Sequence, residues 1–171
     1  MNRMILSFII VLCLGINGCG KSTTIYPELS EGSKAPDFSV RLNNNTIFTL
    51  SEKKGKVVLL NFWATWCSVC VEEFSVLEKL YQKYQNQVEI IAINSGEDKT
   101  TVKSFCKEKD FTVPIGYDEK NEIGKKYPCD GIPYTVIIGK NGKVCDVFTG
   151  AKDAESQYKE YRRALKEAVE Q

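Results

Sequence analysis

The chain has 171 residues, which is enough for one domain and barely enough for two. Its charge is nearly balanced, with 23 Lys and Arg against 22 Asp and Glu, and no long basic run suggests binding to nucleic acid. The absence of His excludes His-based catalysis and His ligation of metals. Seven Cys are many for one domain, so their positions decide the interpretation.

The N-terminal segment 1–18 predicts a lipoprotein signal peptide. A short positive start precedes an apolar run over 4–14, which is too short to span a bilayer comfortably. The following residues resemble the bacterial lipobox, with Ile16 three residues before Cys19 and Gly18 directly before it. This resemblance implies cleavage before Cys19 and lipidation of that residue. An uncleaved anchor or a secretory signal without lipid are the alternatives, and all three place the domain outside the cytoplasm.

The polar residues 19–31 predict a flexible tether, and the folded domain is expected over 32–171. A phosphate-loop pattern, G-x-x-x-x-G-K-S, runs from Gly15 to Ser22. Such a loop binds nucleotide only between a core strand and a helix. Here it lies between an apolar signal and a polar tether, so we expect no nucleotide binding.

The hydropathy pattern along the rest of the chain alternates between strands and helices. Predicted strands cover 38–42, 46–50, 57–62, 88–93, 113–117, 134–138 and 144–149, and predicted helices cover 71–84, 99–110, 122–127 and 153–170. Alternating strands and helices indicate an α/β fold with a parallel sheet centre, to which the last hairpin adds antiparallel strands. The prediction is a central mixed β-sheet flanked by helices, with an N-terminal β extension.

The C-x-x-C motif of Cys67 and Cys70 lies where a buried strand passes into a helix. The free N–H groups at a helix N-terminus stabilise a thiolate, which is the nucleophile in thiol–disulfide exchange. Residues three apart meet on a helix, so Cys70 can resolve a mixed disulfide formed at Cys67. A structural disulfide and half of a zinc site are the alternatives, but a zinc site needs further ligands at suitable spacing, which the sequence lacks.

The run 55–67, ending in Phe62-Trp63-Ala64-Thr65-Trp66-Cys67, resembles the thioredoxin-like envelope oxidoreductases of the TlpA/ResA type. The segments 35–38, 131–133 and 139–144 match other landmarks of that family in the same order. The resemblance spans about 32–170. It implies a thioredoxin-like fold and protein thiol–disulfide oxidoreductase activity.

The resemblance assigns roles to several residues. Pro133 would follow a cis bond and, with the backbone of Ile132, hold the target peptide beside the nucleophile. Glu73 would shift thiol pKa values or relay a proton, with a solvated helix carboxylate as the alternative. Trp66 would belong to the substrate-binding residues. Trp66 and Trp63 would also pack against and shield the pair, with a place in the core as the alternative. Asn61 stands where thioredoxin has a buried Asp.

The resemblance also implies partners for this chain. Protein thiols and disulfides would be its substrates, a membrane thiol transporter its electron donor, and apocytochrome c one candidate target. No cofactor or metal is implied. Val69 and Ser75 replace prolines that are common in the family, and residues between the cysteines tune the potential, so reductase and oxidase or isomerase directions both remain open.

Three other interpretations fit the sequence less well. A peroxiredoxin-type peroxidase needs a Thr or Ser three residues before its Cys, whereas Thr65 lies two before Cys67. A Sco-type copper chaperone needs C-x-x-x-C and a His. A lipoprotein binding module with a structural Cys pair is the last alternative. The remaining cysteines Cys106, Cys129 and Cys145 permit one disulfide, for which Cys129–Cys145 is a guess, or are small buried hydrophobic residues.

Overall fold

The computed structural model describes residues 28–171. The strands are β1 (Ser39–Arg41), β2 (Ile47–Thr49), β3 (Val57–Trp63), β4 (Val88–Ser95), β5 (Ile115–Asp118), β6 (Tyr134–Ile138) and β7 (Val144–Thr149). The helices are α1 (Ser68–Tyr84), α2 (Lys99–Glu108), α3 (Glu122–Lys126) and α4 (Ala154–Glu170), together with a short 3-10 turn over Leu50–Lys53.

Five strands form the central sheet in the order β5-β4-β3-β6-β7. The strand β3 pairs in parallel with β4, and β4 pairs in parallel with β5. On its other side β3 pairs with β6 in antiparallel fashion, and the hairpin of β6 and β7 completes the sheet. All seven residues of β3 are buried, as expected for a central strand covered on both faces.

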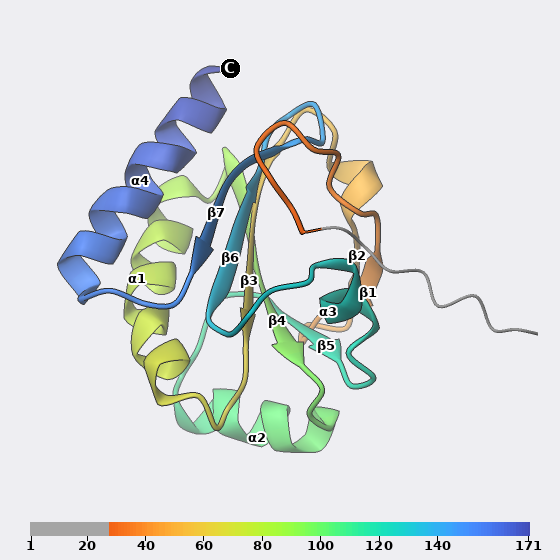
Figure 1. The fold of residues 1–171 in the computed structure, drawn as a ribbon. Coiled ribbons are helices and arrows are strands. Elements are labelled where there is room, and N and C mark those ends of the chain that lie inside the picture. Colours follow the sequence, from red (N-terminus) through yellow and green to blue (C-terminus); the bar gives the residue numbers. More distant parts are fainter. Residues whose placement is uncertain (1–27) are drawn as a thin grey trace, which may run out of the picture.

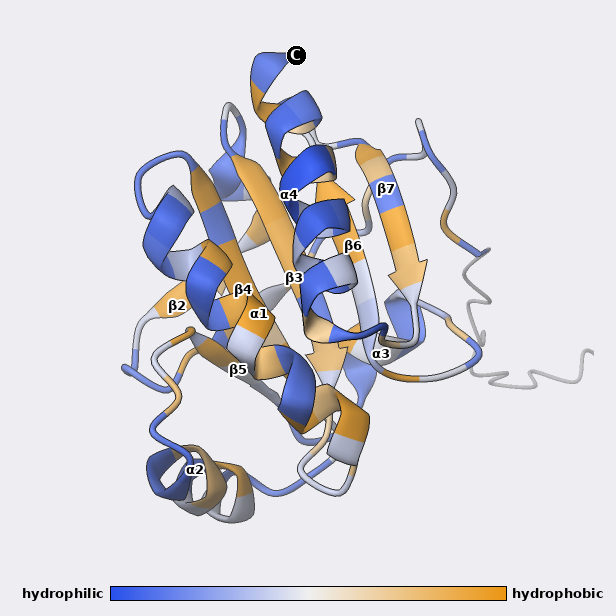
Figure 2. Ribbon diagram, turned by 90° about the vertical axis from the view of Figure 1, so that its left-hand side faces the viewer, coloured by the Kyte–Doolittle hydropathy of each residue, from blue (hydrophilic) through white to orange (hydrophobic). Residues whose placement is uncertain are grey.

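Both faces of the sheet are covered, one by α1 and α4 and the other by α3 and the β1–β2 hairpin. In Figure 1, α1 and α4 lie side by side on one face, while α3 and the β1–β2 hairpin lie on the opposite face. Figure 2 shows the mostly hydrophilic α4 in front of hydrophobic strands of the sheet. Each face therefore has its own apolar core, one including Trp63, Phe74 and Tyr161, and the other including Phe38, Phe62 and Tyr127.

The N-terminal β extension contains a separate two-stranded sheet. This sheet and the segment before it contact the two edges of the central sheet. Leu42 forms a bridge with Gly116 of β5, and Lys34 forms one with Lys143 just before β7. The backbone N–H of Gly32 also donates to the carbonyl of Val144, with an N–O distance of 2.8 Å. The described chain thus starts beside the beginning of β7, at the end of the sheet where β3 also begins.

The predicted fold class is confirmed, with small differences at element ends. The segment between the predicted strands 46–50 and 57–62 contains a 3-10 helix, and α1 begins at Ser68, three residues ahead of the predicted helix 71–84. Over residues 28–171, no helix has the length and apolarity needed to cross a membrane. The signal peptide 1–18, the lipidation of Cys19 and most of the predicted tether lie outside the described residues.

Candidate active site

Cys67 and Cys70 form a disulfide at the N-terminus of α1, directly after the carboxyl end of β3. Their Cα atoms are 5.2 Å apart. Cys67 is the N-cap residue, and its Sγ accepts a hydrogen bond from the backbone N–H of Cys70 at 3.3 Å. This position is usually taken by the side-chain oxygen of Ser, Thr, Asp or Asn. The sulfur of Cys67 therefore occupies the electropositive end of the helix, as the motif predicts.

The loop before β6 faces this disulfide. The Ile132–Pro133 peptide bond is cis, as the resemblance implies. The Sγ of Cys67 lies 3.8 Å from the carbonyl oxygen of Ile132. On its far side the loop is held by β7, because the N–H of Gly150 donates to the carbonyl of Pro133 at 2.8 Å. A backbone carbonyl is thereby fixed beside the sulfur of Cys67.

Glu73 lies one helical turn after Cys70 and is buried, with only 4% of its surface exposed. Its carboxylate accepts hydrogen bonds from the Tyr161 hydroxyl at 2.6 Å and from Nδ2 of Asn61 at 2.8 Å. Burial raises the pKa of Glu73 above its ordinary value, and the two hydrogen bonds oppose that rise. The alternative of a solvated helix carboxylate is therefore wrong.

The chain matches a known family over most of its length. The Redoxin family model matches residues 30–165. The chain belongs to the Redoxin family. The thiol-disulfide oxidoreductase ResA of Bacillus subtilis (strain 168) is 36% identical over 156 residues, which cover 86% of this chain and 87% of ResA. With the Cys67–Cys70 pair in place, this Redoxin-family chain is a thiol–disulfide oxidoreductase of the ResA type.

Solved structures agree with this assignment. A crystal structure of a DsbE-type thiol:disulfide interchange protein from Chlorobium tepidum superposes with a TM-score of 0.76 at 27% identity, covering 83% of this chain and 99% of the other. A solution structure assigned to a protein disulfide isomerase from Bacteroides thetaiotaomicron superposes with a TM-score of 0.71 at 31% identity, covering 81% and 91%. The fold of this Redoxin-family chain is thus thioredoxin-like.

A second carboxylate holds the turn between β3 and Cys67. Glu97 accepts hydrogen bonds from the backbone N–H of Thr65 at 2.7 Å and from its hydroxyl at 2.5 Å. Nδ2 of Asn94, at the end of β4, donates to the same carboxylate at 2.7 Å. The parallel pairing of β3 and β4 brings these groups together at the carboxyl edge of the sheet, and the contacts fix the backbone just before Cys67.

A groove of about 590 Å³ runs beside the disulfide, between the turn at Trp66 and the loop that ends at Ile132. The indole of Trp66 is 73% exposed and Val69 is 46% exposed. Trp63, in contrast, is fully buried and packs edge-to-face on Phe74. Trp63 therefore belongs to the core, in the same cluster as Cys67 and Cys70, whereas Trp66 is exposed and lines the groove.

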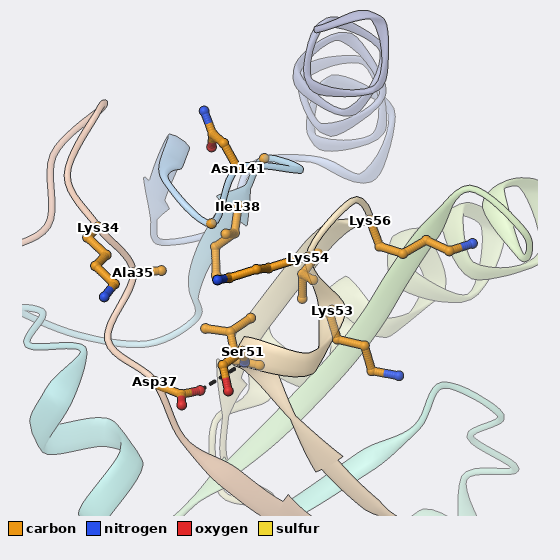
Figure 3. A pocket seen from close by; sticks show the side chains of 13 residues that line it. Lys34, Ala35, Asp37, Ser51, Lys53, Lys54, Lys56, Ile138 and Asn141 are labelled. Carbon is orange, nitrogen blue, oxygen red and sulfur yellow. Dashed lines mark hydrogen bonds between the residues drawn. The ribbon is translucent and has the colours of Figure 1, made fainter.

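A second hollow, of about 170 Å³, is lined by several lysines at the other end of the sheet (Figure 3). It adjoins Val58 at the start of β3 and Ile138 at the end of β6, whereas the disulfide follows the end of β3. Lys53 lies 3.5 Å from Glu89, and Lys56 donates to the carbonyl of Asn86 at 2.8 Å, so two of the lysines have partners elsewhere. This hollow lies away from the cysteine pair.

The other cysteines within residues 28–171 form no disulfide. Cys106 is buried, Cys145 is half-buried and Cys129 is exposed and lines the groove. The guessed Cys129–Cys145 bridge is therefore wrong. Burial, with a smaller contribution from Glu97, raises the pKa of Cys106 to about 11, so this thiol is unreactive at neutral pH.

The structure brings Cys67, Cys70, Glu73, Ile132 and Pro133 together, as the resemblance predicts. The sequence does not predict the hydrogen bonds of Glu73 to Tyr161 and Asn61. Nor does it point to Thr135, which contacts both of these partners, or to Glu97 at the turn before Cys67. A buried tyrosine usually needs a hydrogen-bond partner, and this was the one available signal.

Proposed function

We propose that this chain is a membrane-anchored reductase of the cell envelope, which opens disulfides of extracytoplasmic proteins through Cys67 and Cys70. The observation that carries the proposal is the arrangement around the pair. Cys67 caps α1, the carbonyl of Ile132 lies 3.8 Å from its sulfur, and the buried Glu73 lies one turn away. The site thus offers a stabilised thiolate, a backbone edge for a peptide and a proton acceptor.

The reaction starts from the reduced pair. The Cys67 thiolate attacks one sulfur of a target disulfide, forming a mixed disulfide and releasing the other target sulfur as a thiolate, which takes up a proton. Cys70 then loses its proton and attacks the sulfur of Cys67. The Cys67–Cys70 bond forms, the mixed disulfide breaks, and the second target thiol leaves. Two electrons pass to the target, and a membrane thiol donor would return the pair to the dithiol.

Within this scheme Glu73 is the group that accepts the proton of Cys70. It follows Cys70 by three residues on α1, so both side chains lie on one helix face. A carboxylate whose pKa is raised by burial is a better proton acceptor near neutral pH than an exposed one. This role depends on the burial of Glu73. A carboxylate on the surface would be hydrated, and its pKa would not be raised by burial.

The target peptide would bind along the groove. Ile132 and Pro133 would present backbone beside Cys67, and the exposed indole of Trp66 would contact the target on the opposite side. An exposed aromatic side chain beside a nucleophile suits a contact with apolar residues of a partly unfolded protein. Apocytochrome c is one such target.

The anchor proposal concerns residues 1–31. Residues 1–18 would be removed as a signal peptide, Cys19 would carry the lipid, and 19–31 would tether the domain 32–171. The described chain begins beside the start of β7, at the sheet end opposite to the disulfide. Nine residues, 20–28, span at most about 30 Å. Such an anchor would hold the domain near a bacterial membrane with Cys67 facing outward.

The reduction potential of the pair tests the direction. We would equilibrate the protein with dithiothreitol or glutathione buffers, with Cys67→Ala as the control that cannot cycle. A potential near or below about −270 mV supports a reductase supplied by a membrane donor. A value of about −120 mV would exclude the reductase and favour an oxidase. Incorporation of radiolabelled palmitate, lost in Cys19→Ala, tests the anchor separately.

A further inference from the structure

Tyr161 links the last helix to the helix that carries the cysteines. It lies on α4, is fully buried, and its ring packs edge-to-face on Phe148. Its hydroxyl lies 2.6 Å from Oε1 of Glu73 and 2.9 Å from Oγ1 of Thr135. Thr135 is the second residue after Pro133, so the same hydroxyl also reaches the strand that follows the cis-proline loop.

The hydrogen bonds around Glu73 fit only one set of directions when its carboxylate is ionised. A phenol has one hydrogen, so Tyr161 donates to Glu73 and accepts from the hydroxyl of Thr135. Asn61 donates through Nδ2 both to Oε2 of Glu73, at 2.8 Å, and to Oγ1 of Thr135, at 2.9 Å. Every hydrogen in this ring of four side chains has an acceptor.

A proton on Oε1 of Glu73 would disturb this order. It would have to donate to Tyr161, whose hydroxyl would then turn to Thr135. Thr135 already accepts from Asn61, so its own hydrogen would lose its acceptor within the ring. An unsatisfied buried hydroxyl is unfavourable. With Nδ2 of Asn61 donating to both neighbours, and its Oδ1 left without a partner among the described residues, the ring therefore favours the ionised carboxylate.

We propose that Tyr161 is a positioning residue for the cysteine chemistry, whose hydroxyl holds the ionised carboxylate of Glu73 one helical turn from Cys70. The inference rests on the proton-accepting role given to Glu73 above. Tyr161 extends that role, because the proton affinity of Glu73 sets the pH range in which Cys70 can be deprotonated. The acid limb of the pH profile for disulfide reduction is then controlled from α4.

The other groups around Glu73 act on its charge less directly. A hollow of about 140 Å³ between α1 and the start of α4 is lined by Glu73 itself, Glu72, Lys152 and Asp153. Lys152 pairs with Glu160 at 2.5 Å, and Asp153 accepts the N–H of Ser156 at 3.0 Å. From β3 and β6 the facing groups are Asn61 and Thr135, which do not titrate. Within the described residues, Tyr161 is the titratable side chain that hydrogen-bonds to Glu73.

The test compares Tyr161→Phe with Tyr158→Phe, which removes a phenol from the same helix. Titration of the Glu73 carboxyl by ¹³C NMR measures its proton affinity in the oxidised protein. We expect Tyr161→Phe to move the midpoint upward by about one to two pH units, as the loss of a hydrogen bond to a charged acceptor implies. The acid limb of the rate of disulfide reduction should move by a similar amount, and Tyr158→Phe should move neither.

Two further variants keep the test decisive. Thr135→Val removes the hydroxyl that orients Tyr161 and should give a smaller shift in the same direction, even if Tyr161→Phe folds poorly. In a Glu73→Gln background, Tyr161→Phe should leave the pH profile of the remaining activity unchanged. An unmoved Glu73 midpoint in Tyr161→Phe overturns the inference, and so does a moved midpoint with an unmoved rate profile. A wild-type protein that reduces no disulfide would instead overturn the reductase proposal, while the NMR titration would still decide the hydrogen bond.

Discussion

The carboxylate of Asp118 holds the first turn of α3. It is 5% exposed, and it accepts the backbone N–H groups of Glu122 at 2.8 Å, Ile123 at 2.8 Å and Gly124 at 2.9 Å. A helix of five residues has few hydrogen bonds of its own, and its first N–H groups have no partner within the helix. Asp118 thus supports the segment that leads through Tyr127 into the cis-proline loop.

Replacing Asp118 by Ala should destabilise the protein by about 3 kcal/mol. The N–H of Ile123 is buried, so its lost partner alone costs about 1–3 kcal/mol, whereas water can reach the two partly buried N–H groups and reduce their cost. Asp118→Asn keeps one acceptor oxygen and should lose about half as much. At an m-value of about 2 kcal/mol/M, the urea midpoint of Asp118→Ala should fall by roughly 1.5 M.

The control is Glu122→Gln, which removes a carboxylate from the same turn at an exposed position. This variant should stay within about 0.5 kcal/mol of the wild type. Reaction of the reduced pair with a small aromatic disulfide should keep its rate in Asp118→Asn, because β3 and α1 hold the cysteines independently of α3. An Asp118→Ala protein as stable as the control would refute the reasoning, since it would mean that water replaces the carboxylate without cost.

Three further predictions concern packing and pH. Trp63→Ala should lower the free energy of unfolding by about 3–5 kcal/mol, measured in urea, because the indole is fully buried. Trp66→Ala should lower it by less than about 0.5 kcal/mol but raise the KM for a protein target. Equal losses of stability would contradict the assigned environments. Gly116→Ala would place a Cβ 2.7 Å from Cδ1 of Ile93 and should cost about 1–3 kcal/mol, while Gly131→Ala meets no atom within 4 Å and should be nearly neutral. Because the pKa of Glu73 is raised on folding, its neutral form contributes stability fully below the unfolded pKa, and this contribution is lost as the pH rises through the folded pKa. Urea unfolding at several pH values should show this loss in the wild type and not in Glu73→Gln; an identical pH dependence in both proteins would show that Glu73 is not the group responsible.

The sequence by itself determined the order of the elements and the position of the cysteine pair. Strand and helix periods are local properties of the chain, so β3, β6 and β7 could be placed to within one residue. The link from a buried strand to a helix placed Cys67 at a helix N-terminus, and the motif at 131–133 indicated the cis bond. These features depend on neighbours only a few residues away.

Only the tertiary structure decided the environment of each side chain. Glu73 meets Tyr161 across 88 positions, and Asn61 meets Thr135 across 74, because the sheet pairs β3 with β6 and α4 packs against both α1 and the sheet. Trp63 and Trp66 are three residues apart, yet one is buried and the other is exposed. A contact between distant segments has no local signature, since burial and hydrogen-bond partners arise only when separate elements pack together. The cysteine pair could therefore be predicted from the sequence, whereas the groups proposed to control its protons could be identified only from the tertiary structure.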